Sequence, residues 1–279
     1  MLHIRTMTQQ DIPFAVQLTS QQQWELTEDD FKFSMELERE GCFILLEDSE
    51  PIGLATNISY GKIAWFGNLI VIKTYRNKGA GTQLVKHSIQ HLQRNKVDTI
   101  GLYAYVERIP FYTRLGFVHE SDYVALKGKG FSAPTESNAK LFEASEIGQL
   151  ISYDCKCFGA SRRKLLEPVI LDPDNLCYVA HEKQAIIGYA VAKVYHGVAE
   201  LGPLACQNGR NDTAINLIKA ILNRLKGLEV SMLVPKKETV IIKMLAKNGF
   251  IERFQAARMF HGPPIPDRCL CLAESLERG

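Results

Sequence analysis

The second half of this sequence repeats landmarks of the first half, and this repeat restricts the possible folds more than any other feature. The separation is 135 positions, as from Ile52 to Ile187 (187 − 52 = 135). The matched landmarks are Asp11-Ile12 with Glu146-Ile147, Glu47 with Glu182, Ile52-Gly53-x-Ala55 with Ile187-Gly188-x-Ala190, Gly67-x-Leu69 with Gly202-x-Leu204 and, at nearly the same shift, Gly116-Phe117 with Gly249-Phe250. Because 279 residues are too many for one typical domain, we expect two similar domains.

The boundary between these domains is expected where periodic apolar residues give way to Gly, Pro and small polar residues. That change begins around Gly128 and Gly130 and continues through Ser132, Ala133 and Pro134. We therefore predict a first domain over residues 1–130, a linker over 131–138 and a second domain over 139–279.

Within the first domain, an apolar run leads directly into a basic, glycine-rich turn and then into an amphipathic helix. We expect a long strand over residues 63–72 and a helix over residues 82–94. Gly79 and Gly81 would let backbone amides approach an anion, with help from the positive end of the helix dipole. The candidate anion-binding residues are Arg76, Asn77, Lys78, Gly79, Ala80, Gly81 and Thr82. By itself this turn is equally consistent with an ordinary strand-to-helix connection.

The surrounding pattern predicts a mixed α/β domain. Residues 43–47 and 51–59 are expected to form a hairpin, and residues 99–105 another strand. A short helix over residues 109–115 should end at Gly116.

Two ordered motifs resemble the GNAT (Gcn5-related N-acetyltransferase) superfamily. The first is Arg76-x-x-Gly79-Ala80-Gly81, and the second is Phe111-Tyr112-x-x-x-Gly116-Phe117. The start of the chain, Ile4-Arg5-x-Met7-Thr8-x-x-Asp11-Ile12, is similar to the first strand of that family and its entry into a helix. The resemblance implies an α/β (α+β) class with two tandem GNAT folds, each a central twisted mixed β-sheet flanked by helices.

This resemblance implies acetyl-CoA as cofactor and a role for each motif. The pyrophosphate would bind the amides of residues 77–82, and the pantetheine arm would pair with the backbone of Leu69, Ile70 and Val71 beside a local bulge. Tyr112 would be the general acid that protonates the departing thiolate. The alternative for Tyr112 is an aromatic residue that covers the end of its helix.

The resemblance leaves the general base unassigned. Many family members have a carboxylate near the end of the central strand, where this chain has Asn68. Glu107, Tyr103 and Tyr105 are nearby candidates, and a chain of water molecules is a further alternative.

The second domain is expected to be divergent and to lack the cradle. At the same shift, residues 76–81 correspond to residues 211–216. This second set contains neither a glycine nor a cation, and it includes the carboxylate of Asp212. That charge would repel a pyrophosphate. Tyr112 corresponds to a position near Leu245.

Candidate acceptor-binding residues are Trp24, Asn68, Tyr103 and Arg162. Trp24 is close in sequence to four acidic residues, Glu25, Glu28, Asp29 and Asp30. The acids could attract a cationic amine and the Trp24 ring could stack on it. The simpler interpretation of the acids is a helix start, with Thr27 as N-cap and Asp30 at the capping-box position. Arg162 could clamp a carboxylate, although a solvated cation at a helix start is the favoured interpretation.

No metal site is expected. The seven cysteines form an odd, scattered set rather than a disulfide framework, which suits a reducing compartment: Cys42, Cys155, Cys157, Cys177, Cys206, Cys269 and Cys271. The two C-x-C pairs lack the C-x-x-C spacing of common zinc sites. His87 and His91 lie one helical turn apart without a matching ligand.

The charge balance says little about partners, and we expect neither nucleic acid nor a membrane to be one. A net charge of +2 demands no basic face for nucleic acid or membrane. The polar start of the chain does not look like a signal peptide, and no apolar run reaches the roughly 18 residues of a membrane span, so we expect a cytoplasmic protein. Whether it is a monomer or a homodimer stays open.

Two functions follow from these expectations. The leading one is an acetyl-CoA-dependent N-acetyltransferase that acts on the primary amine of a small molecule or amino-acid-like acceptor. The alternative is a non-catalytic acyl-CoA-binding sensor or scaffold.

Overall fold

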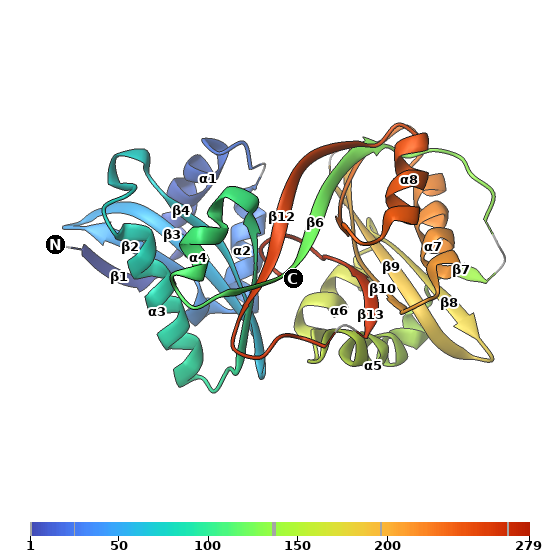
Figure 1. The fold of residues 1–279 in the computed structure, drawn as a ribbon, viewed down its shortest axis with the longest axis horizontal. Helices are drawn as coiled ribbons and strands as arrows, with labels where there is room; N and C mark the ends of the chain where they lie inside the picture. The colour runs from blue at the N-terminus through green and yellow to red at the C-terminus, as the bar shows by residue number, and fades with distance from the viewer. Residues whose placement is uncertain (1, 25, 136–137, 196, 267) are drawn as a thin grey trace.

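The protein consists of two lobes built on one continuous twisted sheet (Figure 1). The structure is a computed structural model that describes residues 2–24, 26–135, 138–195, 197–266 and 268–279. In these residues the strand order is β1-β2-β3-β4-β5-β12-β6-β11-β10-β9-β8-β7, and β13 pairs with β10 outside this path. The predicted mixed α/β class with helices flanking a sheet is confirmed.

Lobe 1 comprises residues 2–117. Its elements are β1 (Leu2–Thr6), α1 (Ile12–Ser20), α2 (Glu28–Leu37), β2 (Phe43–Glu47), β3 (Glu50–Tyr60), β4 (Ile63–Val71), α3 (Ala80–Arg94), β5 (Thr99–Tyr105) and α4 (Ile109–Thr113). The hairpin, the two strands and the two helices predicted after residue 43 are all present, with ends shifted by at most two residues. Leu84 and Val85 of α3 are fully buried against the sheet, as their spacing on one helix face predicts.

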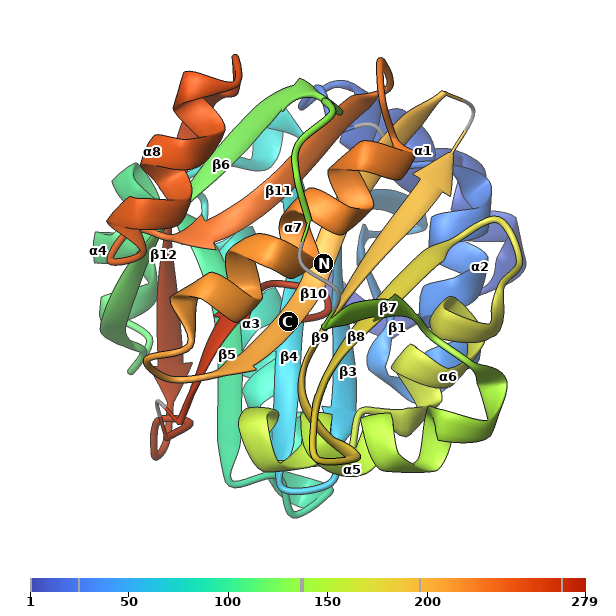
Figure 2. The ribbon, with the colours of Figure 1, turned by 90° about the vertical axis from the view of Figure 1, so that its right-hand side faces the viewer.

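Lobe 2 comprises residues 138–250. Its elements are β7 (Ala139–Leu141), α5 (Ile147–Phe158), α6 (Arg163–Leu171), β8 (Leu176–Glu182), β9 (Ala185–Tyr195), β10 (Val198–Gln207), α7 (Asn211–Arg224), β11 (Glu229–Pro235) and α8 (Thr239–Lys247). Figure 2 shows α7 lying across this part of the sheet. Successive side chains of a strand point to opposite faces of the sheet. In β9, Ala190 accordingly packs with α7 on one face, and Val191 packs with α5 and α6 on the other.

Two long strands, β6 (Val118–Lys129) and β12 (Ile251–His261), connect the lobes. β12 pairs antiparallel with β5 of lobe 1, and β6 pairs antiparallel with β11 of lobe 2. The two strands also pair with each other. Each half therefore gives its strand after the Gly-Phe landmark to the sheet of the other half.

The predicted linker contains no helix or strand in its described residues, while Glu136 and Ser137 lie outside them.

A disulfide joins Cys157, near the end of α5, to Cys269 at the start of β13 (Cys269–Leu272). The expectation of a cysteine set without disulfides is therefore wrong at this pair. Sequence spacing could not reveal it, because the two residues are 112 positions apart and meet only through the fold.

None of the described helices combines the length and the apolar character needed to cross a membrane.

Candidate active site

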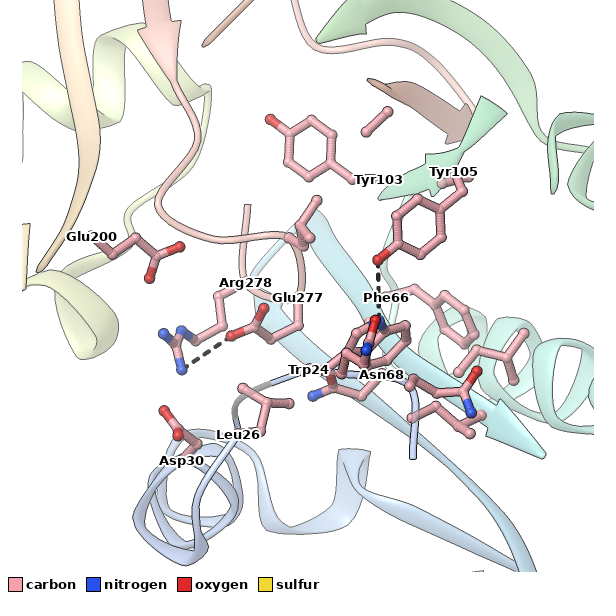
Figure 3. A pocket seen from close by; sticks show the side chains of 18 of the residues that line it. Trp24, Leu26, Asp30, Phe66, Asn68, Tyr103, Tyr105, Glu200, Glu277 and Arg278 are labelled. Atoms are coloured by element: carbon pink, nitrogen blue, oxygen red, sulfur yellow. Dashed lines mark hydrogen bonds and ion pairs between the residues drawn. The ribbon is translucent and has the colours of Figure 1, made fainter. Parts of the chain in front are cut away.

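A large cavity of about 1990 Å³ lies where the two lobes meet. Its walls come from β4, β5, α4 and the α1–α2 loop of lobe 1, and from β9, β10 and β11 of lobe 2. Figure 3 shows side chains from both lobes around this space. A cavity of this size exceeds the usual 300–1,000 Å³ of a small-ligand pocket, so it can hold more than one reactant.

β4 and β5 separate from each other along one wall of this cavity. Their parallel pairing covers only Ile63–Trp65 with Thr99–Gly101. Beyond Trp65, the edge of β4 has no partner strand on the β5 side among the described residues, so its backbone is open to an extended ligand. The described part of this edge includes Leu69, Ile70 and Val71, and all three line the cavity.

A bulge in β4 lies at the start of this open edge. Gly67 pairs with Thr56 and Ile70 pairs with Leu54, so Asn68 and Leu69 oppose the single residue between them. Asn68 has a φ of 50°, a left-handed conformation that asparagine tolerates better than most residues. Its side-chain amide donates to Thr56 Oγ1 at 3.2 Å. Asn68 thus forms the bulge at the position where the resemblance implies a carboxylate in many family members.

The glycine-rich turn follows the open edge and leads into α3. Asn77 and Gly79 have φ values of 62° and 88°, and no described side chain caps the start of α3. Alternating left-handed residues before an uncapped helix start make a concave group of backbone donors, which suits an anion. A Cβ at Gly79 would meet no atom within 4 Å, so glycine is needed there for its φ and the space above it is open.

Most of the predicted cofactor residues line the cavity together, but two do not. Arg76, Asn77, Gly79, Gly81 and Thr82 are in its wall, and Arg76 Nε also donates to the carbonyl of Val71 at 2.8 Å. Lys78 lies outside this cavity with its amine over the ring of Tyr75, and Ala80 is buried under the turn.

Tyr112 of α4 faces the same cavity from the opposite side of the open edge. Its ring is 9% exposed and contacts Phe66, Phe111 and Phe117 edge to face. Burial raises the pKa of its phenol more than the nearby Arg108 lowers it. The phenol therefore keeps its proton at neutral pH, and no described residue is hydrogen-bonded to its hydroxyl.

The α1–α2 loop covers the cavity next to β5. Trp24 Nε1 donates to the Tyr105 hydroxyl at 3.1 Å. Thr27 and Asp30 form the predicted capping box at the start of α2, which confirms the simpler interpretation of these acids. Glu25 lies outside the described residues. Tyr103 lines the cavity and its ring contacts Trp65 and Tyr123.

Arg162 is not in the cavity wall. It is 4% exposed, pairs with Asp154 at 2.6 Å and donates to the carbonyl of Gly279 at 2.5 Å. The expectation of a solvated cation is therefore wrong, because the neighbouring α5 supplies a buried carboxylate for it. The sequence could not show that these two residues face one another.

The segment of residues 273–279, here called the inter-lobe segment, passes between the lobes at the base of both strand separations. In lobe 1, a Cβ on Gly67 would stand 2.5 Å from the Cα of Glu277. In lobe 2, a Cβ on Gly202 would stand 1.9 Å from the carbonyl oxygen of Ala273. These repeated glycines therefore permit the segment to lie directly against β4 and β10.

A buried charge network holds this segment. Lys193 of β9 pairs with Glu274 at 2.6 Å and with Glu200 at 2.8 Å, and Arg278 pairs with Glu274 at 2.9 Å. Burial alone would raise the pKa of Glu274, but Arg278 and Lys193 bring it down to about 2. The segment is thus fixed by compensated charges, which would be costly to separate.

In lobe 2, β10 and β11 separate as β4 and β5 do in lobe 1, but the gap between them is filled by β13. β10 and β11 pair only along Val198–Glu200 with Glu229–Ser231. β13 then pairs with β10 at Leu204–Gln207, the positions that correspond to Leu69–Ile72 in lobe 1 (69 + 135 = 204 and 72 + 135 = 207). In lobe 2, the chain itself therefore occupies the edge of β10 that corresponds to the open edge of β4, where the resemblance implies that pantetheine binds in lobe 1.

The described residues contain no group of three or more His, Cys, Asp or Glu side chains placed to hold a metal ion. One member of each C-x-C pair is consumed by the disulfide.

The sequence did not identify the residues that lobe 2 and the inter-lobe segment contribute to this cavity. Lys193, Glu200, Glu277 and Arg278 all line it. The only signal was indirect: a glycine at the same place in both halves indicates a close backbone approach. Nothing in the sequence indicated which segment approaches.

Comparison with known proteins identifies both halves. Residues 6–117 match the family model described as "Acetyltransferase (GNAT) family", and residues 150–270 match the one described as "Acetyltransferase (GNAT) domain". The chain is also 21% identical over 210 residues to the uncharacterized N-acetyltransferase YitH of Bacillus subtilis, covering 74% of this chain and 73% of the relative.

Solved structures share the whole fold. A putative acetyltransferase from Pyrococcus horikoshii superposes with a TM-score of 0.80 at 23% identity, over 100% of this chain and 96% of the other. A tandem GNAT protein from the clavulanic acid biosynthesis pathway superposes with a TM-score of 0.65 at 11% identity, over 95% and 100% of the two chains. Acetyltransferases of this family use acetyl-CoA in general. The two matched halves, together with the observed fold, show that the chain is an acetyltransferase of the GNAT family with two GNAT domains in tandem.

Proposed function

We propose that this protein transfers the acetyl group of acetyl-CoA to the primary amine of a small molecule or amino-acid-like acceptor, and that only lobe 1 binds the cofactor. The observation that carries this proposal is the open edge of β4, which begins at the bulge, ends at an uncapped helix start and faces a buried tyrosine. In lobe 2 the corresponding edge is covered by β13.

The residues present fit acetyl-CoA. The amides of residues 77–82 bind the pyrophosphate, and Arg76 adds positive charge beside it. The open backbone of Leu69, Ile70 and Val71 pairs with the pantetheine arm. When bound, acetyl-CoA supplies the activated acetyl thioester.

The protein positions the thioester and supplies one proton to the leaving group. The bulge at Asn68 and Leu69 places backbone beside the thioester, where an N–H donor can stabilise the developing oxyanion. The Tyr112 hydroxyl donates its proton to the departing thiolate, and its raised pKa keeps that proton available at neutral pH. The amine enters from the lobe 2 side of the cavity.

A thiol-release assay tests the proposal. The full chain is incubated with acetyl-CoA and a panel of primary amines, and calorimetry measures the number of acetyl-CoA sites. We expect amine-dependent thiol release and one site per chain. Two equivalent sites would refute the assignment to lobe 1. Tight binding without thiol release for any amine would instead support the acyl-CoA sensor.

A further inference from the structure

We propose that the side-chain carboxylate of Glu277 is the general base that takes the proton from the acceptor ammonium in this reaction. This role rests on the proposed function above and supplies the base that the motifs of lobe 1 lack. It also makes the preferred acceptor an amine that enters as a cation.

The position of Glu277 is fixed against the bulged strand. Its Cα lies against Gly67, the residue that precedes Asn68 at the bulge. The carbonyls on either side of it are both held, because Trp65 Nε1 donates to Leu276 at 3.3 Å and the Tyr60 hydroxyl donates to Arg278 at 2.9 Å. Side chains of β3 and β4 thus position the segment beside the reacting part of the cavity.

The carboxylate of Glu277 is sheltered but reaches the cavity. Its side chain is 12% exposed and lines the cavity, where Figure 3 shows its carboxylate directed toward Arg278. One oxygen, Oε1, lies 3.4 Å from an Arg278 nitrogen, and no described donor contacts Oε2. An accepting oxygen is therefore left for a ligand.

Charged groups from three parts of the chain surround this carboxylate. Arg278 and Glu274 belong to its own segment, Lys193 and Glu200 come from β9 and β10, and Asp30 of α2 lines the same space. Burial raises the pKa of Glu277, and Glu200 and Glu274 add to this effect against Arg278 and Lys193. A carboxylate with a raised pKa is a stronger base than an exposed one.

Other carboxylates in the cavity wall are less suited to this role. Glu200 is paired with Lys193, Glu229 with Lys127, and Asp30 with the start of α2. Glu107 is exposed at the end of β5. Glu277 combines shelter, an unpaired oxygen and contact with the bulged strand.

The proposed step balances as follows. The ammonium gives one proton to Glu277, and the resulting amine nitrogen forms a bond to the thioester carbon. The carbon–sulfur bond then breaks, its electron pair leaves on sulfur, and the thiolate receives the Tyr112 proton. The second proton lost by nitrogen returns to the Tyr112 phenolate, and Glu277 releases its proton to solvent. The products are the amide, CoA thiol and one proton.

The test compares Glu277→Gln with the wild-type chain on acceptors of different basicity. We expect kcat/KM for a lysine-type ε-amine, with a pKa of about 10.4, to fall by about 10²–10⁴-fold. The loss should be smaller for an α-amine, with a pKa of about 7.7–8.0, because more of it is already neutral. The Kd for acetyl-CoA should change by less than about twofold. Glu229→Gln, another carboxylate of the cavity wall, is the matched control.

The outcomes separate this role from the proposed function. A similar loss for both amines would mean that Glu277 supports only the structure, and an unchanged rate would likewise overturn its role as base. Each of these results requires an active wild-type chain. A wild-type chain that releases no thiol with any amine would refute the proposed function itself, and this role with it.

Discussion

The two lobes contain the same strand separation, and they differ in what occupies it. In lobe 1 the edge of β4 beyond Trp65 is open, whereas in lobe 2 the corresponding edge of β10 pairs with β13. The helix after the edge also differs, since α3 starts after a left-handed glycine and α7 carries Asp212 in its first turn. A duplicated fold can thus keep its architecture while its ligand edge is closed by the chain itself. The following predictions test this difference, from the largest expected effect to the smallest.

Tyr112→Phe should reduce kcat by about 10²–10⁴-fold, because the leaving thiolate would lose the proton donor that we propose for it. Lobe 2 has Leu245 near the corresponding position, so it offers no phenol there. Steady-state thiol release measures the effect, and Tyr178→Phe in lobe 2 serves as a matched control. A variant that retains full activity would show that Tyr112 only packs against its aromatic neighbours.

Gly81→Asp should weaken acetyl-CoA binding by about 100-fold, because it gives α3 the first-turn carboxylate that α7 has in Asp212. Two unit charges 4 Å apart interact by about 4 kcal/mol at an effective dielectric constant of 20, and solvent screening reduces this. Calorimetry provides the Kd. Gly81→Ala is the control, because its Cβ would make only ordinary contacts, with the Phe111 ring at 3.6 Å and Val71 Cγ2 at 4.0 Å. Equal affinities for the two variants would contradict the pyrophosphate assignment.

Gly67→Ala and Gly202→Ala should each lower the free energy of unfolding by about 1–3 kcal/mol, because each methyl group would displace the inter-lobe segment. Their effects on catalysis should differ. Gly67→Ala would displace Glu277 and should lower kcat/KM well beyond the loss of stability, while Gly202→Ala acts in the lobe that we propose binds no cofactor. Denaturant unfolding and thiol release on both variants give this comparison. A larger catalytic loss in Gly202→Ala would reverse the assignment of the lobes.

Asp11→Asn should destabilise the protein by about 1–2 kcal/mol at neutral pH. Burial would raise the pKa of Asp11, but Arg5 at 2.7 Å and Thr8 bring it down from 3.8 to about 2. A lowered folded-state pKa contributes stability above pH 3.8 that is lost as the pH falls through about 2. Acid unfolding of the variant should therefore lack this part of the pH dependence. In lobe 2 the matching Glu146 pairs with His181, so its substitution provides the comparison.

Local sequence signals predicted lobe 1 well. Apolar periodicity located β4 and α3, and the spacing of Thr27 and Asp30 predicted the capping box that starts α2. These features depend on residues a few positions apart, so the local sequence determines the conformation that they favour. Gly79 and Tyr112, which the two motifs contain, both line one cavity in the structure.

Features that depend on distant contacts could not be predicted. The repeat could not show that β6 and β12 change places, because equivalent strands present similar faces to either neighbour. The partners of Arg162 and Cys157 lie in segments that meet only after folding. The inter-lobe segment has no counterpart in the first half, so the repeat gave no indication that Glu277 reaches the cavity.

The exchange of β6 and β12 has a consequence for cleavage of the chain. A protease cut between residues 131 and 135 would break the covalent connection but leave the backbone ladders β5–β12 and β6–β11 intact. The nicked protein should therefore remain interlocked as a two-piece complex. Separating the pieces would expose the edges of β5 and β11, which invite aggregation.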